Sequence, residues 1–149
     1  MNETVTHSPD ETQELATAVA DGLLAAKLDR ASVVTLRGDL GAGKTTFAQG
    51  LLRALGVSDR VTSPTFVLMQ RYPLAAGSFK DAYHVDAYRL MRTDDLASLG
   101  LDAVLADPKN LVIVEWPEVG GSLFEPTADV ALAHGAHPEE RRISLTWHA

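Results

Sequence analysis

The sequence predicts a single α/β domain with a P-loop NTPase-like, three-layer fold, in which helices cover a mixed β-sheet that includes a C-terminal antiparallel hairpin. Three observations support this fold class. A glycine-rich loop at 38–46 lies between an apolar run and a helical pattern, a second apolar run at 111–115 ends in a carboxylate, and two alternating segments close the chain. The 149 residues suffice for one core, and we expect 1–149 to form one domain.

The composition is that of a globular protein without covalent cross-links. The hydrophobic fraction is 46%, the charged fraction is 22% and there is no cysteine, which excludes disulfides and thiolate metal sites. No apolar run reaches the length of about 18 residues that a bilayer span needs, and the first residues carry no basic start. The net charge of −7 disfavours direct binding of a polyanion. We therefore expect a cytoplasmic protein without membrane contact.

A first helix is expected from Ser8 to about residue 27. Ser8 is a typical N-cap, Pro9 suits the first helical position, and Glu11 is placed to accept from the backbone N–H of the cap. This helix enters just ahead of the strand that leads to the glycine loop. We therefore expect Glu11 and Thr12 to border the base of a bound nucleotide.

The segment Gly38-Asp39-Leu40-Gly41-Ala42-Gly43-Lys44-Thr45-Thr46 fits the phosphate-binding pattern G-x-x-x-x-G-K-[ST]. It follows the β-branched run 33–36 and precedes a helical pattern over 46–55, which is the context that such a loop requires. Small residues let successive N–H groups face phosphate oxygens, Lys44 reaches the outer phosphates, and Thr45 offers its hydroxyl to Mg²⁺. The loop predicts a nucleoside triphosphate with Mg²⁺ as the ligand.

A hydroxyl-bearing segment follows the helix of the loop. The segment 61–68 presents the hydroxyls of Thr62, Ser63 and Thr65 ahead of an expected strand that ends near Tyr72. Ser63 precedes a proline and is therefore biased to an extended backbone. In nucleoside triphosphatases, such a segment often senses the γ-phosphate and its metal. The alternative is a strand entry with small polar residues.

The turn at 75–78 links two expected strands, which form a hairpin or lie as neighbours, with the second strand over 82–86. His84 and Asp86 are two residues apart and share one face of that strand. Asp86 falls at the C-terminal end, the edge at which α/β sheets bind ligands. We therefore expect Asp86 at the site.

A buried parallel strand is expected over 111–115, after a short helix at 93–99 and a further apolar turn at 101–105. Four apolar residues that deliver Glu115 to the ligand edge form the Walker B arrangement. Trp116 and the following proline end the strand. The last two strands are the alternating segments 129–134 and 142–147, which predict a hairpin that extends the sheet.

Together these motifs closely resemble those of the bacterial TsaE family, formerly YjeE. The resemblance spans roughly residues 8–120. It is carried by the phosphate loop, Ser63-Pro64-Thr65-Phe66, His84-Val85-Asp86-Ala87-Tyr88-Arg89 and Val114-Glu115-Trp116-Pro117-Glu118. The order of the H-x-D-x-Y-R and E-W-P elements is specific to that family, whereas the C-terminal hairpin matches less well.

The resemblance implies a small P-loop ATPase, weak alone, that takes ATP and Mg²⁺ and serves tRNA threonylcarbamoyladenosine synthesis. Its partners would be TsaD and TsaB, and it would meet tRNA only through their complex. The resemblance also implies that Thr45 and Glu115 ligate Mg²⁺ and that Asp86 lies near the metal. Trp116 corresponds to the tryptophan of the family beside the acid.

We expect Lys44, Asp86 and Glu115 to be the catalytic residues. Lys44 and the loop amides hold the β- and γ-phosphates, and the two acids share the outer ligands of the metal and the attacking water. The sequence leaves open which acid orients that water.

Two alternative functions use the same loop. A small-molecule kinase would need an acceptor pocket and an arginine-bearing lid, for which Arg89 and Arg92 are the candidates near the site. A regulatory nucleotide-binding module would act by conformation alone. The sequence has neither an N-K-x-D segment for guanine nor a D-x-x-G switch, which disfavours a GTPase.

Overall fold

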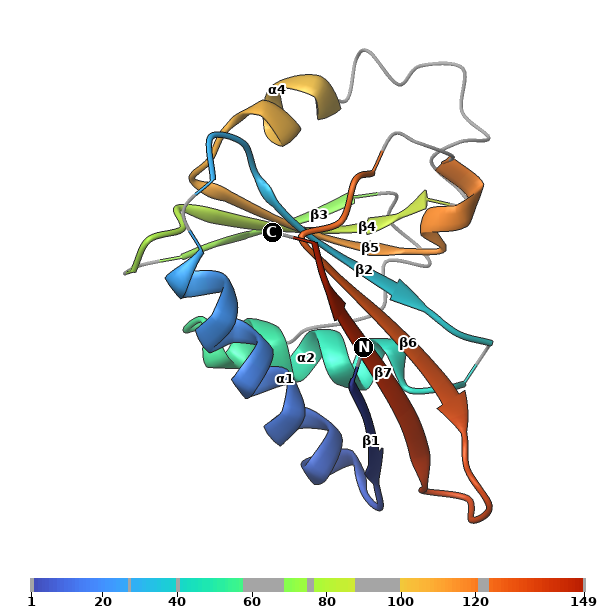
Figure 1. Cartoon of the computed structure of the whole chain (residues 1–149). Coiled ribbons are helices and arrows are strands. Elements are labelled where there is room, and N and C mark those ends of the chain that lie inside the picture. Colours follow the sequence, from blue (N-terminus) through green and yellow to red (C-terminus); the bar gives the residue numbers. More distant parts are fainter. Residues whose placement is uncertain are drawn as a thin grey trace.

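A computed structural model of the chain describes residues 2–26, 28–39, 41–57, 69–74, 77–87, 100–120 and 124–148. Within these ranges the centre is a seven-stranded sheet in the order β1-β7-β6-β2-β5-β4-β3, with helices on both faces (Figure 1). This confirms the predicted three-layer α/β fold with a mixed sheet.

The described elements have the following bounds. The strands are β1 (Asn2–Thr6), β2 (Ser32–Arg37), β3 (Met69–Pro73), β4 (Asp81–Asp86), β5 (Asn110–Glu115), β6 (Ala128–His134) and β7 (Arg141–Trp147). The helices are α1 (Pro9–Ala25), α2 (Lys44–Ala54) and α4 (Leu101–Ala106), with the 3₁₀ helix η3 (Pro117–Gly120) after β5. α1 is shorter than expected at its C-terminal end, and α2 begins at the lysine of the loop itself.

The middle of the sheet is parallel. β2 pairs in parallel with β5 and β6, and β5 pairs in parallel with β4. Antiparallel pairs of β3 with β4, β7 with β6 and β1 with β7 extend both sides, which confirms the two predicted hairpins. Because parallel strands end at the same edge, the loop after β2 and the last residues of β4 and β5 meet there.

Alternation along the strands produces the two faces of the core. Val34 and Leu36 of β2 pack with α1 and α2, whereas Val33 packs on the other face with Leu101 of α4. The α1 and α2 helices lie together below the sheet in Figure 1, and α4 lies above it. His84, Asp86 and Glu115 share the strand parity of the α2 face, so they belong to the side of the sheet that carries Lys44.

The first turn of α1 is capped as predicted, with one difference. The Ser8 hydroxyl accepts from the Glu11 N–H at 3.2 Å. The Glu11 carboxylate, however, accepts from the His7 N–H at 2.9 Å and not from the N–H of the cap. The predicted return bond was therefore wrong by one residue.

The α1 and α2 helices approach closely at Gly50. A Cβ atom at this position would lie 2.7 Å from the Cα atom of Gln13, closer than nonbonded carbon atoms approach. Gly50 therefore sets how tightly α2, with the loop at its start, packs against α1.

The strand β1 was not predicted. Its residues are mostly polar, and it is held by antiparallel pairing with β7, in which Thr6 is opposite Arg141. The hydroxyls of Thr6 and Thr12 lie 2.8 Å apart and join β1 to the first turns of α1.

Two predicted features lie outside the described residues. They are the hydroxyl-bearing segment 61–68 and the short helix at 93–99.

Candidate functional site

The phosphate loop leaves β2 and turns directly into α2. Gly38, Gly41 and Gly43 all have positive φ, of 154°, 79° and 103°, and Gly43 is the left-handed N-cap of α2. A Cβ atom at Gly38 would lie 2.5 Å from the carbonyl oxygen of Leu132 on β6, so this turn fits against the sheet only as glycine. The result is a tight loop at a helix N-terminus, which is suited to binding phosphate.

Lys44 is buried and makes two close contacts. Its residue is only 5% exposed, and its ammonium donates to the carbonyl oxygen of Gly38 at 2.7 Å. The same Nζ atom lies 3.5 Å from the centroid of the Trp116 ring. Trp116 has a φ of 61°, a left-handed backbone that bulky residues rarely adopt. The corner after β5 is therefore bent so that the indole reaches the lysine.

The charge of Lys44 is set by its surroundings. Burial lowers the pKa of the Lys44 ammonium from its usual value of 10.5. Four carboxylates oppose this shift, in the order Glu115, Glu118, Asp39 and Asp86. A buried cation among acids is the charge pattern expected where a polyanion and its counterion bind.

The two predicted acids end neighbouring parallel strands. Asp86 of β4 and Glu115 of β5 are opposite each other in the register, and both residues are buried, at 7% and 5% exposed. The Glu115 carboxylate has a further partner in His84, whose Nε2 lies 2.6 Å from Oε2. The structure thus brings together five of the candidate site residues, namely Lys44, Asp86, Glu115, His84 and Trp116, and their roles stay predictions.

The donors around these acids fit a magnesium ion that also binds phosphate. In the described residues, no group of three or more His, Cys, Asp or Glu side chains is placed to hold a metal by itself. Asp86, Glu115 and the half-buried Thr45 at the start of α2 are hard oxygen donors. Mg²⁺ usually binds through one or two carboxylates together with phosphate oxygens and water, which such a partial set of donors allows.

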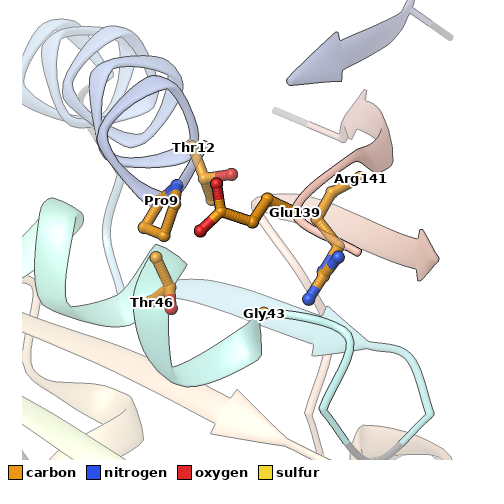
Figure 2. A pocket seen from close by; sticks show the side chains of 6 residues that line it. All are labelled: Pro9, Thr12, Gly43, Thr46, Glu139 and Arg141. Atoms are coloured by element: carbon orange, nitrogen blue, oxygen red, sulfur yellow. The ribbon is translucent and has the colours of Figure 1, made fainter. Parts of the chain in front are cut away.

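A pocket of about 200 Å³ opens beside the loop (Figure 2). It is lined by Pro9, Thr12, Gly43, Thr46, Glu139 and Arg141. Of the two residues predicted to border the base of a nucleotide, Thr12 lines this pocket, whereas Glu11 is exposed and is not among the described residues that line it. Their contact with a nucleotide stays a prediction.

Glu139 and Arg141 were missed by the sequence reasoning. In Figure 2 the guanidinium of Arg141 points toward the loop, and it donates to the carbonyl oxygen of Gly41 at 3.2 Å. It also donates to the carbonyl oxygens of Pro138 and Glu140, at 2.7 and 2.9 Å. The long polar connection between the last two strands was the available signal, but it did not reveal that the hairpin reaches the loop.

Some predicted site residues lie outside the described residues. They are Leu40 of the loop, the hydroxyl residues Ser63 and Thr65, and the residues after β4, Tyr88 and Arg89.

The loop, the helix that begins at its lysine and the acids at the ends of parallel strands define this chain, by its fold, as a P-loop NTPase-like protein. The sequence model of the family described as "Threonylcarbamoyl adenosine biosynthesis protein TsaE" matches residues 6–143. The chain belongs to the TsaE family, which acts in tRNA threonylcarbamoyladenosine biosynthesis.

Individual relatives agree with this family. The tRNA threonylcarbamoyladenosine biosynthesis protein TsaE of Haemophilus influenzae is 35% identical over 126 residues, which are 85% of this chain and 77% of that protein. The protein of the same name from Streptomyces coelicolor is 47% identical over 106 residues, 70% of this chain and 68% of its own length. The corresponding Bacillus subtilis protein is 34% identical over 141 residues, 95% of this chain and 82% of that protein.

A solved structure shares the fold. The crystal structure of YdiB from Bacillus subtilis superposes with a TM-score of 0.72 at 27% identity, and the match covers 99% of this chain and 86% of that chain. In the described part of this chain, no helix combines the length and the apolar character needed to cross a membrane.

Proposed function

We propose that this chain binds ATP with Mg²⁺ and hydrolyses it, and that it supports threonylcarbamoyl transfer to a tRNA adenosine by a complex of TsaD and TsaB in the cytoplasm. The observation that carries the proposal is the loop itself. Gly43 caps α2 in a left-handed conformation, and the next residue, Lys44, is buried among acids.

The loop and its lysine bind the phosphates in this proposal. The N–H groups of the first turn of α2 have no partners within the helix, so they are available to phosphate oxygens. When nucleotide binds, the Lys44 ammonium leaves the carbonyl oxygen of Gly38 and contacts the outer phosphates. The negative charge of the phosphates then offsets the free-energy cost of burying the ammonium. The base and sugar extend from there into the pocket of Thr12, Glu139 and Arg141.

The acids at the strand ends serve the chemistry. Thr45, Asp86 and Glu115 hold the magnesium ion, directly or through water. When bound, Mg²⁺ supplies charge neutralisation of the phosphates. Asp86 or Glu115 orients the water that attacks the γ-phosphorus, releasing ADP and inorganic phosphate. Comparing Asp86→Asn with Glu115→Gln in single-turnover reactions decides between the two acids, because only the one that orients the water slows the chemical step with nucleotide and metal saturating.

Calorimetry tests the binding part of the proposal. Titration of the intact chain with ATP, with Mg²⁺ and then with EDTA in place of Mg²⁺, should give magnesium-dependent binding. Lys44→Ala should lose it while remaining folded by circular dichroism. Absence of magnesium-dependent binding by the folded wild-type chain would refute the proposal.

Phosphate release tests the role with partners. We expect slow release by the chain alone and faster release when TsaD, TsaB and a tRNA substrate are present. Unchanged release in the assembly would argue against the role with these partners. A phosphorylated small molecule appearing with ADP would favour a kinase instead.

A further inference from the structure

His84 is the one histidine in the described part of the chain that is entirely buried. Its exposed fraction is 0%, and in β4 it lies between Ala82 and Asp86 on the face toward α2. Its neighbours across the sheet are Gln70 of β3 and Ile113 of β5. A buried imidazole costs free energy that a leucine at the same position would not.

One strong contact offsets this cost. The Nε2 atom of His84 is 2.6 Å from Oε2 of Glu115, and the Glu115 side chain is itself only 7% exposed. The other ring nitrogen, Nδ1, is buried and has no hydrogen-bond partner among the described residues. Among the described residues, the imidazole ring of His84 therefore makes its side-chain hydrogen bond to Glu115.

The geometry also indicates which nitrogen carries the proton. An ionised carboxylate only accepts hydrogen bonds, so Nε2 must donate to Glu115. Nδ1 has no partner in the described part of the chain, so the ring is held to Glu115 through Nε2 alone.

We propose that His84 is a positioning residue for Glu115, which holds Oε2 so that the other oxygen, Oε1, is presented to the magnesium ion or to a water bound to it. This inference rests on the proposed function. A donor fixed within the sheet limits rotation of the carboxylate, and such partners of metal ligands commonly change metal affinity by about 10–100-fold.

Three variants separate the donor from the bulk of the ring. His84→Gln keeps an N–H donor at a similar distance from the backbone, His84→Leu keeps an apolar side chain without a donor, and Tyr83→Phe is the matched control. Tyr83 is adjacent in sequence but packs with the opposite core, on the α4 side. The three variants and the wild-type chain are first compared by urea unfolding, so that only folded variants are interpreted.

The main measurement is ADP binding by calorimetry across a series of Mg²⁺ concentrations, with EDTA as the metal-free reference. For His84→Leu we expect a rise of about tenfold or more in the Mg²⁺ concentration that gives half of the metal-dependent gain in ADP affinity. The ADP affinity without metal should be unchanged. His84→Gln and Tyr83→Phe should stay within about threefold of wild type, on the same scale. A folded His84→Leu protein with the wild-type Mg²⁺ requirement would overturn the inference.

A second measurement does not depend on the leucine variant folding. In ¹⁵N spectra of the wild-type chain, the His84 ring should carry a proton on Nε2, the nitrogen that faces Glu115. Its signals should move when Mg²⁺ is added to the ADP complex. A ring without a proton on Nε2, or signals that do not respond to the metal, would overturn the inference. If the wild-type chain shows no magnesium-dependent nucleotide binding at all, the proposed function fails as well, whereas the outcomes above refute only the role of His84.

Discussion

The Nζ atom of Lys44 lies 3.5 Å from the centroid of the Trp116 ring, while it donates to the carbonyl oxygen of Gly38 at 2.7 Å. The aromatic face and the carbonyl dipole both stabilise the ammonium in the absence of phosphate. A phosphate that binds the ammonium competes with these two contacts. The indole next to the acid therefore reports directly on whether the lysine has moved.

Trp116 should dominate the change in intrinsic fluorescence when nucleotide binds. The other tryptophan, Trp147, is 40% exposed and pairs with Ala128, at the end of the hairpin away from the loop. Titration with MgADP should therefore change the emission of Trp147→Phe as in wild type, whereas Trp116→Phe should show little change. Loss of the signal in Trp147→Phe would contradict the assignment.

Replacing Lys44 by methionine should stabilise the fold at neutral pH and abolish nucleotide binding. Burial lowers the pKa of Lys44, so the folded state carries a cost for the ammonium that methionine does not. Urea unfolding at pH 7 measures this difference. Lys109→Met, at an exposed lysine, is the control and should change stability little.

The difference in stability between wild type and Lys44→Met should depend on pH. Below the lowered folded-state pKa, Lys44 is charged in both the folded and the unfolded states, and the folded state bears the full cost. Between that pKa and 10.5, the unfolded state binds more protons, so the free energy of unfolding of wild type rises with pH relative to Lys44→Met. If the stability difference between wild type and Lys44→Met stays constant up to pH 10.5, the charge of Lys44 is not the cause of that difference.

Gly43→Ala should separate backbone strain from loss of the phosphate site. Gly43 has a φ of 103°, and an added Cβ atom would face Arg141 across the pocket at 3.7 Å. Gly56 has a similar φ of 98° and open space around it, so Gly56→Ala is a matched control. Both variants should lose about 1–2 kcal/mol of stability in urea unfolding. We expect ATP affinity to fall only in Gly43→Ala, and an equal fall in both would contradict a local role of Gly43.

Arg141→Ala should weaken nucleotide binding without unfolding the chain. Its guanidinium lines the pocket and donates to Gly41 of the loop, so its removal costs both a loop contact and a positive charge. Loss of about 1.5 kcal/mol corresponds to roughly tenfold in the dissociation constant of ATP. The neighbouring exposed Arg142→Ala is the control, and equal effects of the two substitutions would show that only net charge matters.

The local and periodic features of this fold were predictable from sequence. The apolar runs of β2 and β5 and the glycines before α2 carry enough signal to place a loop and an acid at one sheet edge. The H-x-D spacing likewise placed His84 and Asp86 on one face, although it did not indicate that Nε2 of His84 lies against Glu115.

Long-range partners were not predictable in the same way. Arg141 is 100 residues from Gly41, and its contact with the loop depends on the length and twist of the last hairpin. The strand β1 forms because β7 offers an open edge, and its own residues carry no apolar alternation. The Glu11 carboxylate accepts from the N–H of His7 and not from that of Ser8, and helix propensities do not distinguish between two adjacent N–H groups.

The position of the parallel strands has a consequence for local opening of the protein. β2 is bonded on one side to β6 and on the other to β5, and β5 is bonded on its far side to β4. Their amides should therefore be among the last to exchange with deuterium, well after those of the outer strands β1 and β3. The strands that carry the glycine loop and the two acids would thus stay paired through local openings that fray the outer strands of the sheet.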